Sequence, residues 1–182
     1  DFSTTASPRW IFGSLGPGTK LPTLGHTTYQ KLKDAYALAS QGLVDGGCDA
    51  LLIETTQDLL QAKAAVNGAR AAREKCERDI VLIAQVTVET TGTMLLGSEI
   101  GAALNSLAAL DVDLIGMNCA TGPAEMSEHL RTLSKSSPIG ISCMPNAGLP
   151  VLKDGGAYYP LGPDELATSL STFVDEYGVG LI

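Results

Sequence analysis

The sequence predicts an α/β fold of the (β/α)8 or TIM barrel type, of which the chain supplies only part. Short apolar runs of about four to eight residues alternate with longer stretches in which apolar residues recur every three or four positions. The runs begin about 34 residues apart on average, and polar residues follow nearly every one of them. Consecutive strand–helix units of this kind form a parallel sheet with right-handed crossovers.

Six strands are predicted, and most of them are nearly continuous in Val, Ile and Leu. Such runs are typical of parallel strands that are covered on both faces. The predicted strands are residues 10–15, 50–53, 80–88, 112–117, 139–143 and 179–182.

Five helices are predicted between the strands from apolar stripes with a helical period. The stripes cover residues 29–43, 59–69, 104–108, 126–133 and 166–177. Gly46 and Gly47 end the first helix, and Thr56 is the expected N-cap of the second. Residues 151–162 are expected to form a long loop between a strand and a helix.

Two architectures fit this order, an open doubly wound sheet and a barrel. In an open sheet, functional groups gather at one switch point, whereas in a barrel several strands deliver them at their carboxyl ends. Polar residues follow almost every predicted strand here, which favours the barrel. Eight units of this length need about 270 residues. The chain also opens on Asp1 rather than Met and ends in a strand-like run, so we expect an incomplete barrel.

The composition fits one folded domain over residues 1–182. The chain is 45% hydrophobic and 18% charged, which excludes a disordered segment. No apolar run approaches the roughly 20 residues of a spanning helix, so no membrane partner is expected. The net charge of −8 argues against a nucleic-acid partner. Four cysteines without a C-x-x-C pair favour a reducing compartment, the cytoplasm.

Several residues at the predicted strand ends could carry chemistry. Glu54 directly follows a buried strand and could pair with a substrate ammonium, act as a base, or bond a neighbouring loop. Cys119 could ligate a metal or attack an electrophile, although most isolated cysteines are buried packing residues. Cys143 competes for the same role. Asn146 and Gly148 lie in a loop where glycine permits close approach of a ligand, or simply a turn.

Four motifs lie at or near the ends of predicted strands: Gly13-Ser14-Leu15-Gly16-Pro17, Glu54-Thr55-Thr56-Gln57-Asp58, Gly116-Met117-Asn118-Cys119 and Pro145-Asn146-Ala147-Gly148-Leu149-Pro150. Taken together, these motifs resemble the homocysteine S-methyltransferase family. They occur in the family's order and span essentially the whole chain. Within the family, they are most similar to the homocysteine-binding modules of cobalamin-dependent methionine synthases.

The resemblance implies a zinc-dependent methyltransferase built on a (β/α)8 barrel. Zinc is held there by three cysteine thiolates, of which Cys119 matches one. The other two form a pair beyond the last residue of this chain, and the first two strands precede its first residue. Glu54, Asn118, Asn146 and Gly148 are the implied substrate-binding residues, and no residue is assigned as a catalytic acid or base.

The implied reaction deprotonates the homocysteine thiol on zinc and methylates it from methylcobalamin, giving methionine. The cobalamin and a folate site belong to other modules of the same long chain. Three alternatives remain open: a cobalamin-independent enzyme using a sulfonium or betaine donor, a non-catalytic ligand-binding barrel, and an unrelated barrel aldolase. The aldolase is disfavoured because no lysine lies at a strand end.

Overall fold

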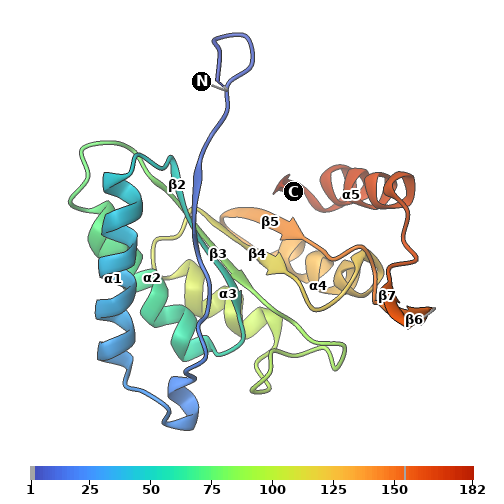
Figure 1. The fold of residues 1–182 in the computed structure, drawn as a ribbon, viewed down its shortest axis with the longest axis horizontal. Helices are drawn as coiled ribbons and strands as arrows, with labels where there is room; N and C mark the ends of the chain where they lie inside the picture. Colours follow the sequence, from blue (N-terminus) through green and yellow to red (C-terminus); the bar gives the residue numbers. More distant parts are fainter. Residues whose placement is uncertain (1–2, 154) are drawn as a thin grey trace.

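The computed structural model describes residues 3–153 and 155–182, so Asp1, Phe2 and Asp154 lie outside the described residues. Strands and helices alternate along the chain, as the sequence predicts (Figure 1). The strands are β1 (Phe12–Leu15), β2 (Ala50–Thr56), β3 (Val81–Val86), β4 (Leu114–Asn118), β5 (Gly140–Met144), β6 (Val151–Lys153), β7 (Gly156–Tyr158) and β8 (Val179–Leu181). The helices are α1 (Tyr29–Asp45), α2 (Leu59–Arg73), α3 (Ile100–Ala108), α4 (Pro123–Ser136) and α5 (Pro163–Tyr177), with a 3-10 turn, η1 (Pro22–Leu24).

The main sheet has the strand order expected of a barrel wall. Its six strands are all parallel and neighbour one another in chain order, β1-β2-β3-β4-β5-β8. A doubly wound sheet would instead reverse its strand order at a switch point. Consecutive helices also contact one another, from α1 to α5. The sheet is therefore an arc of a barrel wall, with β1 and β8 as its edges.

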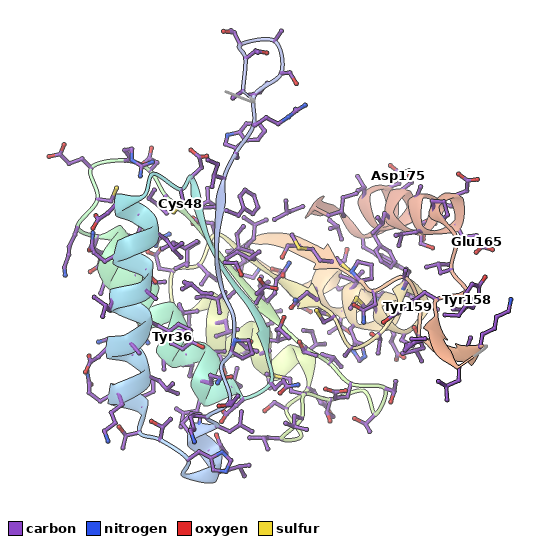
Figure 2. All side chains as sticks on the ribbon, viewed as in Figure 1. Tyr36, Cys48, Tyr158, Tyr159, Glu165 and Asp175 are labelled. Carbon is purple, nitrogen blue, oxygen red and sulfur yellow. The ribbon has the colours of Figure 1, made fainter. Side chains whose placement is uncertain are left out.

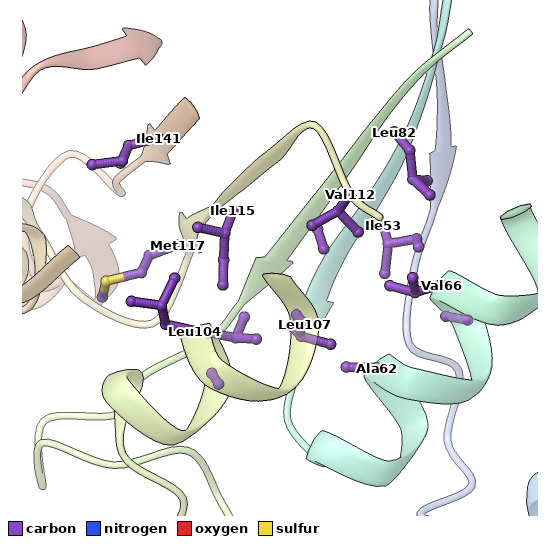
Figure 3. Close-up of a cluster of buried hydrophobic side chains, with 14 of the residues drawn as sticks. Ile53, Ala62, Val66, Leu82, Leu104, Leu107, Val112, Ile115, Met117 and Ile141 are labelled. Atoms are coloured by element: carbon purple, nitrogen blue, oxygen red, sulfur yellow. The ribbon is translucent and has the colours of Figure 1, made fainter. Parts of the chain in front are cut away.

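The two faces of the sheet differ in what covers them. One face packs against the helices, where Ile53 and Ile115 meet Val66, Leu104 and Leu107 in the main core (Figure 3). A smaller apolar cluster lies on the opposite face, which corresponds to the barrel interior. It is made of Ala50, Leu52 and Ile83, with Leu114, Met144 and Leu181 packed against it.

The end of β2 and the start of α2 differ from the sequence prediction. Thr56 belongs to the strand and is buried, with its hydroxyl donating to the Gln85 carbonyl at 2.8 Å. Asp58 caps the helix instead, since its carboxylate accepts from the backbone N–H of Leu60 and Gln61. The strand runs three residues beyond the predicted end because polar cross-strand bonds extend it.

The segment predicted as a loop over residues 151–162 contains a two-stranded antiparallel hairpin, β6 with β7. Lys153 Nζ lies 4.9 Å from the Tyr158 ring centre, a cation–π contact across the hairpin. Tyr158 lies near the outer edge of the molecule (Figure 2), and both Tyr158 and Tyr159 are about half exposed. None of the helices in the described part of the chain has the length and hydrophobicity needed to cross a bilayer.

Candidate active site

The structure brings together three of the predicted site residues, Glu54, Asn118 and Cys119. They lie at the ends of β2 and β4, because the carboxyl ends of parallel strands share one edge of the sheet. Asn118 Nδ2 is 3.3 Å from Glu54 Oε2 and 3.3 Å from Cys119 Sγ. The amide of Asn118 therefore links the carboxylate to the thiol.

A β-bulge at the end of β2 presents Glu54 and Thr55 together. Two residues of β2 lie between Ile53 and Thr56, whereas a single residue of β3 lies between their partners Ala84 and Val86. Thr55 takes up the extra length with a φ of 57°, a left-handed conformation that is costly for a β-branched residue.

Asn118 holds Thr55 in this conformation with two hydrogen bonds. Its Oδ1 accepts from the Thr55 backbone N–H at 2.8 Å, and its Nδ2 donates to Thr55 Oγ1 at 2.7 Å. Asn118 is only 3% exposed. Hydrogen bonds in such a buried position are stronger than in water and offset the backbone cost at Thr55.

Both carboxylate oxygens of Glu54 accept hydrogen bonds from neighbouring side chains. Ser14 Oγ donates to Oε1, while Thr55 Oγ1 donates to Oε2 at 3.4 Å, on the same oxygen as Asn118. The ion pairs found over the described residues do not include Glu54. A half-buried carboxylate without a cationic partner is suited to bind a substrate ammonium.

The structure separates the two competing cysteines. Cys119 lies in a left-handed turn with φ 58°, half-buried, with its Sγ 3.7 Å from Thr55 Oγ1. Cys143 is fully buried on the helix side of the sheet, with its Sγ 3.6 Å from the sulfur of Met126. Burial raises the pKa of the Cys143 thiol to about 12. Cys119 is thus the thiol that adjoins Glu54 and Asn118, and Cys143 is a packing residue.

Asn146 and Gly148 lie in the loop after β5, beside the loop that follows β4. Asn146 donates its backbone N–H to the Thr121 carbonyl at 3.1 Å. A Cβ on Gly122 would come within 2.7 Å of the Gly148 Cα, so these two loops are in close contact. Within the described residues, neither Asn146 nor Gly148 hydrogen-bonds to Glu54, Asn118 or Cys119.

Two residues of the cluster, Ser14 and Thr55, were not singled out from the sequence. Both belong to the motifs quoted above, and both are hydroxyl residues at or near a strand end. Their places at or near predicted strand ends could therefore have indicated that both are polar residues at the edge of the sheet. Their roles depend on the pairing of β1 with β2 and on the left-handed Thr55, which residue types do not reveal.

The zinc site implied by the resemblance can be tested against the side chains. A catalytic zinc site needs three protein ligands. Over residues 3–153 and 155–182, no group of three or more His, Cys, Asp or Glu side chains is arranged to hold a metal ion. Cys119 fits one thiolate position at an accessible strand end, but the described residues do not make a complete site.

Comparisons with known proteins relate the chain to one family. A family model described as homocysteine S-methyltransferase matches residues 1–182. The methionine synthase of Mycobacterium tuberculosis is 63% identical over 174 residues, and that of Mycobacterium leprae is 60% identical over 182. These alignments cover 96% and 100% of this chain but only 15% of each relative.

Solved structures share the fold. The apo form of the homocysteine methyltransferase MmuM from Escherichia coli superposes with a TM-score of 0.74 at 18% identity, covering 97% of this chain and 58% of that one. The metallated form of the same enzyme superposes with a TM-score of 0.70 at 19% identity, covering 98% of this chain and 57% of that one. The family match and the two mycobacterial relatives, together with this barrel-wall fold, show that the chain belongs to the homocysteine S-methyltransferase family.

Proposed function

We propose that this chain binds homocysteine and presents its thiol for methylation to methionine, as part of a methionine synthase. The family match over residues 1–182 and the identity of 60–63% to two methionine synthases support this function. The methyl group would come from methylcobalamin held by another module of the same protein, with a folate-binding module as a further partner. The cobalamin assignment comes from the motif resemblance.

The observation that carries the proposal is the contact of Asn118 with both Glu54 and Cys119. Homocysteine has a thiol at one end and an ammonium and a carboxylate at the other. In the proposed site, Glu54 accepts hydrogen bonds from the ammonium, and Cys119 lies on the thiol side. Asn118 keeps the two side chains at a fixed separation through its 3.3 Å contacts. A substrate bound at both ends is oriented for attack on the methyl donor.

We further propose that Cys119 is one of three thiolate ligands of a zinc ion, with the other two supplied from outside this chain. When bound, zinc favours the thiolate form of a coordinated substrate thiol at neutral pH. This chain would contribute one ligand and the groups around it. The Cys119 backbone N–H donates to the Met144 carbonyl at 3.2 Å, which fixes the turn that presents the sulfur.

Asn146 and Gly148 are proposed to line the substrate site from the loop after β5. That loop follows the strand next to β4, and its backbone at Asn146 bonds the loop that begins at Cys119. Gly148 has a φ of 80°, a conformation that glycine adopts without strain.

We also propose that the protein works in the cytoplasm. The four cysteines are unpaired, which fits a protein of this reducing compartment.

A matched pair of variants in the full-length protein tests the zinc proposal. Cys119→Ser should reduce bound zinc at least tenfold and abolish methyl transfer, because a serine hydroxyl is a poor zinc ligand. Cys143→Ser makes the same chemical change on the other face of the sheet and should keep one zinc per protein. Metal analysis and turnover are measured on both. Retention of zinc and rate by Cys119→Ser would contradict the assignment of the ligand.

Assays of the full-length protein with different methyl donors distinguish the alternative reactions. Turnover of homocysteine with methylcobalamin supports the proposed reaction. Methylation that proceeds only with a sulfonium or betaine donor would instead indicate the cobalamin-independent reaction. Failure to bind homocysteine would favour a non-catalytic ligand-binding barrel and would overturn the proposal.

A further inference from the structure

We propose that Ser14 is a positioning residue that fixes the orientation of the Glu54 carboxylate and so determines the preference for thiols that carry an amino group. The inference rests on the proposed function, in which Glu54 binds the substrate ammonium. It concerns a residue that makes no substrate contact of its own.

Ser14 and Glu54 share the face of the sheet that points away from the helices. Ser14 pairs with Leu52 in the register of β1 and β2, and Leu52 belongs to the apolar cluster of that face. Glu54 is two residues further along β2, so its side chain is on the same face. Ser14 Oγ donates a hydrogen bond to Glu54 Oε1. Over the described residues this is the one hydrogen bond recorded for the Ser14 side chain.

The two oxygens of Glu54 have different hydrogen-bond donors. Ser14 approaches Oε1 from β1, whereas Asn118 and Thr55 approach Oε2 at 3.3 and 3.4 Å. The Oε2 contacts are long for hydrogen bonds, and Asn118 divides its two amide hydrogens among three acceptors. The contact from Ser14 is therefore needed to set the rotation of the carboxylate about its last side-chain bond.

This geometry leaves acceptor capacity for a ligand. A carboxylate offers about four lone-pair positions, and Oε1 has one partner. An ammonium group binds best to an acceptor that is already oriented, because no side-chain entropy is then lost on binding. Removal of the Ser14 hydroxyl frees the carboxylate to rotate toward solvent on the exposed β1 side, where Ser14 itself is exposed.

The test measures binding of two thiols to the full-length protein, L-homocysteine and 4-sulfanylbutanoic acid, which lacks the amino group. Ser14→Ala should weaken homocysteine binding about tenfold, as expected for a hydrogen bond to a charged group. Binding of the amino-free thiol should change by less than about twofold. Ser14→Thr, which keeps the hydroxyl, should restore the preference. Ser171→Ala, an exposed serine on α5, is the matched control and should leave both affinities unchanged.

Steady-state kinetics provides a second readout. If Ser14 contributes equally to binding of the substrate and of the transition state, Ser14→Ala raises KM for homocysteine about tenfold and leaves kcat unchanged. A fall in kcat with an unchanged preference between the two thiols would overturn the inference, because it would indicate a structural defect.

Glu54→Gln separates failure of the inference from failure of the proposed function. This variant should lose homocysteine affinity about a hundredfold, because it removes the charge that receives the ammonium. If Glu54→Gln weakens homocysteine selectively and Ser14→Ala does not, the inference about Ser14 is wrong and the proposed role of Glu54 stands. If neither variant changes the preference, the proposed role of Glu54 is wrong as well.

Discussion

Gly116 in β4 is the position at which a single methyl group should be least tolerated. A Cβ built on Gly116 would lie 2.0 Å from the Ser142 carbonyl oxygen, 2.2 Å from Ser142 Oγ and 2.6 Å from the Ser142 carbonyl carbon. Two of these atoms are backbone of the neighbouring strand, so no side-chain rotation relieves the clash. The φ of Gly116 is not left-handed, so the cost of an alanine here is steric.

The magnitude follows from the displacement that the clash requires. Carbon and oxygen need roughly 3.2 Å, so β4 and β5 must separate by about 1 Å at the pair Gly116–Ser142. That separation weakens the ladder between the two strands and the Gln85–Ser142 bond of 3.2 Å. We expect Gly116→Ala to lower the free energy of unfolding by about 3 kcal/mol or more.

The matched control is Gly101→Ala in α3, where a Cβ meets nothing within 4 Å. Alanine in a helix is favoured over glycine by about 1 kcal/mol, so this variant should be slightly more stable than the parent. Urea unfolding should be followed by far-ultraviolet circular dichroism, because Trp10 is the single tryptophan and is 67% exposed. With a slope of about 2 kcal/mol/M, the Gly116→Ala midpoint should fall by about 1.5 M. Midpoints of the two variants within about 0.3 M of each other would refute the steric reasoning.

Two further outcomes are expected from buried groups. Asp58 is 1% exposed, caps α2 and accepts from both the backbone N–H and the hydroxyl of Thr23. Asp58→Ala should therefore lower the free energy of unfolding, measured in urea, by about 3 kcal/mol. Asp34→Ala on the exposed face of α1 should lower it by less than about 0.5 kcal/mol, and equal losses in the two variants would contradict this reasoning. The Cys143 pKa is raised by burial to about 12, so the unfolded thiol ionises first, and stability is retained below about pH 9 and lost as pH rises toward 12. Between about pH 9.5 and 11, Cys143→Ala should reduce the loss of unfolding free energy by up to about 1.4 kcal/mol per pH unit. The same slope in the variant and the parent would show that another group causes the loss.

The order of the elements was predictable from the sequence because buried parallel strands have a distinctive composition. Runs of Val, Ile and Leu satisfy both faces of such a strand, and the helices between them show a clear apolar period. The boundary at Thr56 was not predictable in the same way. Its hydroxyl is satisfied by the Gln85 carbonyl of the neighbouring strand, so a polar residue continues the strand where composition alone predicts its end. The hairpin of β6 and β7 was missed because each strand has only three residues.

For the site, the sequence could predict where polar groups gather but not how they bond. Glu54 and Asn118 were expected at one edge, and they meet there because parallel strands end on the same side. The role of Ser14 depends on its register with Leu52, and that of Thr55 on a bulge and a φ of 57°. The register and the bulge are both properties of strand pairing. They can be determined only from a structure in which the neighbouring strands are in place.

The Asn118 side chain links the strained turn at Thr55 to the Glu54 carboxylate and the Cys119 thiol. Its amide nitrogen has two hydrogens, yet three acceptors lie within reach: Thr55 Oγ1 at 2.7 Å, and Glu54 Oε2 and Cys119 Sγ, both at 3.3 Å. The shorter bond to Thr55 takes one hydrogen and supports the left-handed backbone, so the carboxylate and the sulfur share the other. In the proposed function, an ammonium that donates to Glu54 would therefore supply a hydrogen bond that the chain itself does not fully provide, and it would leave the shared Asn118 hydrogen to Cys119. Binding of the proposed substrate at the carboxylate would in this way be coupled to the hydrogen bonding of the Cys119 thiol through one buried amide.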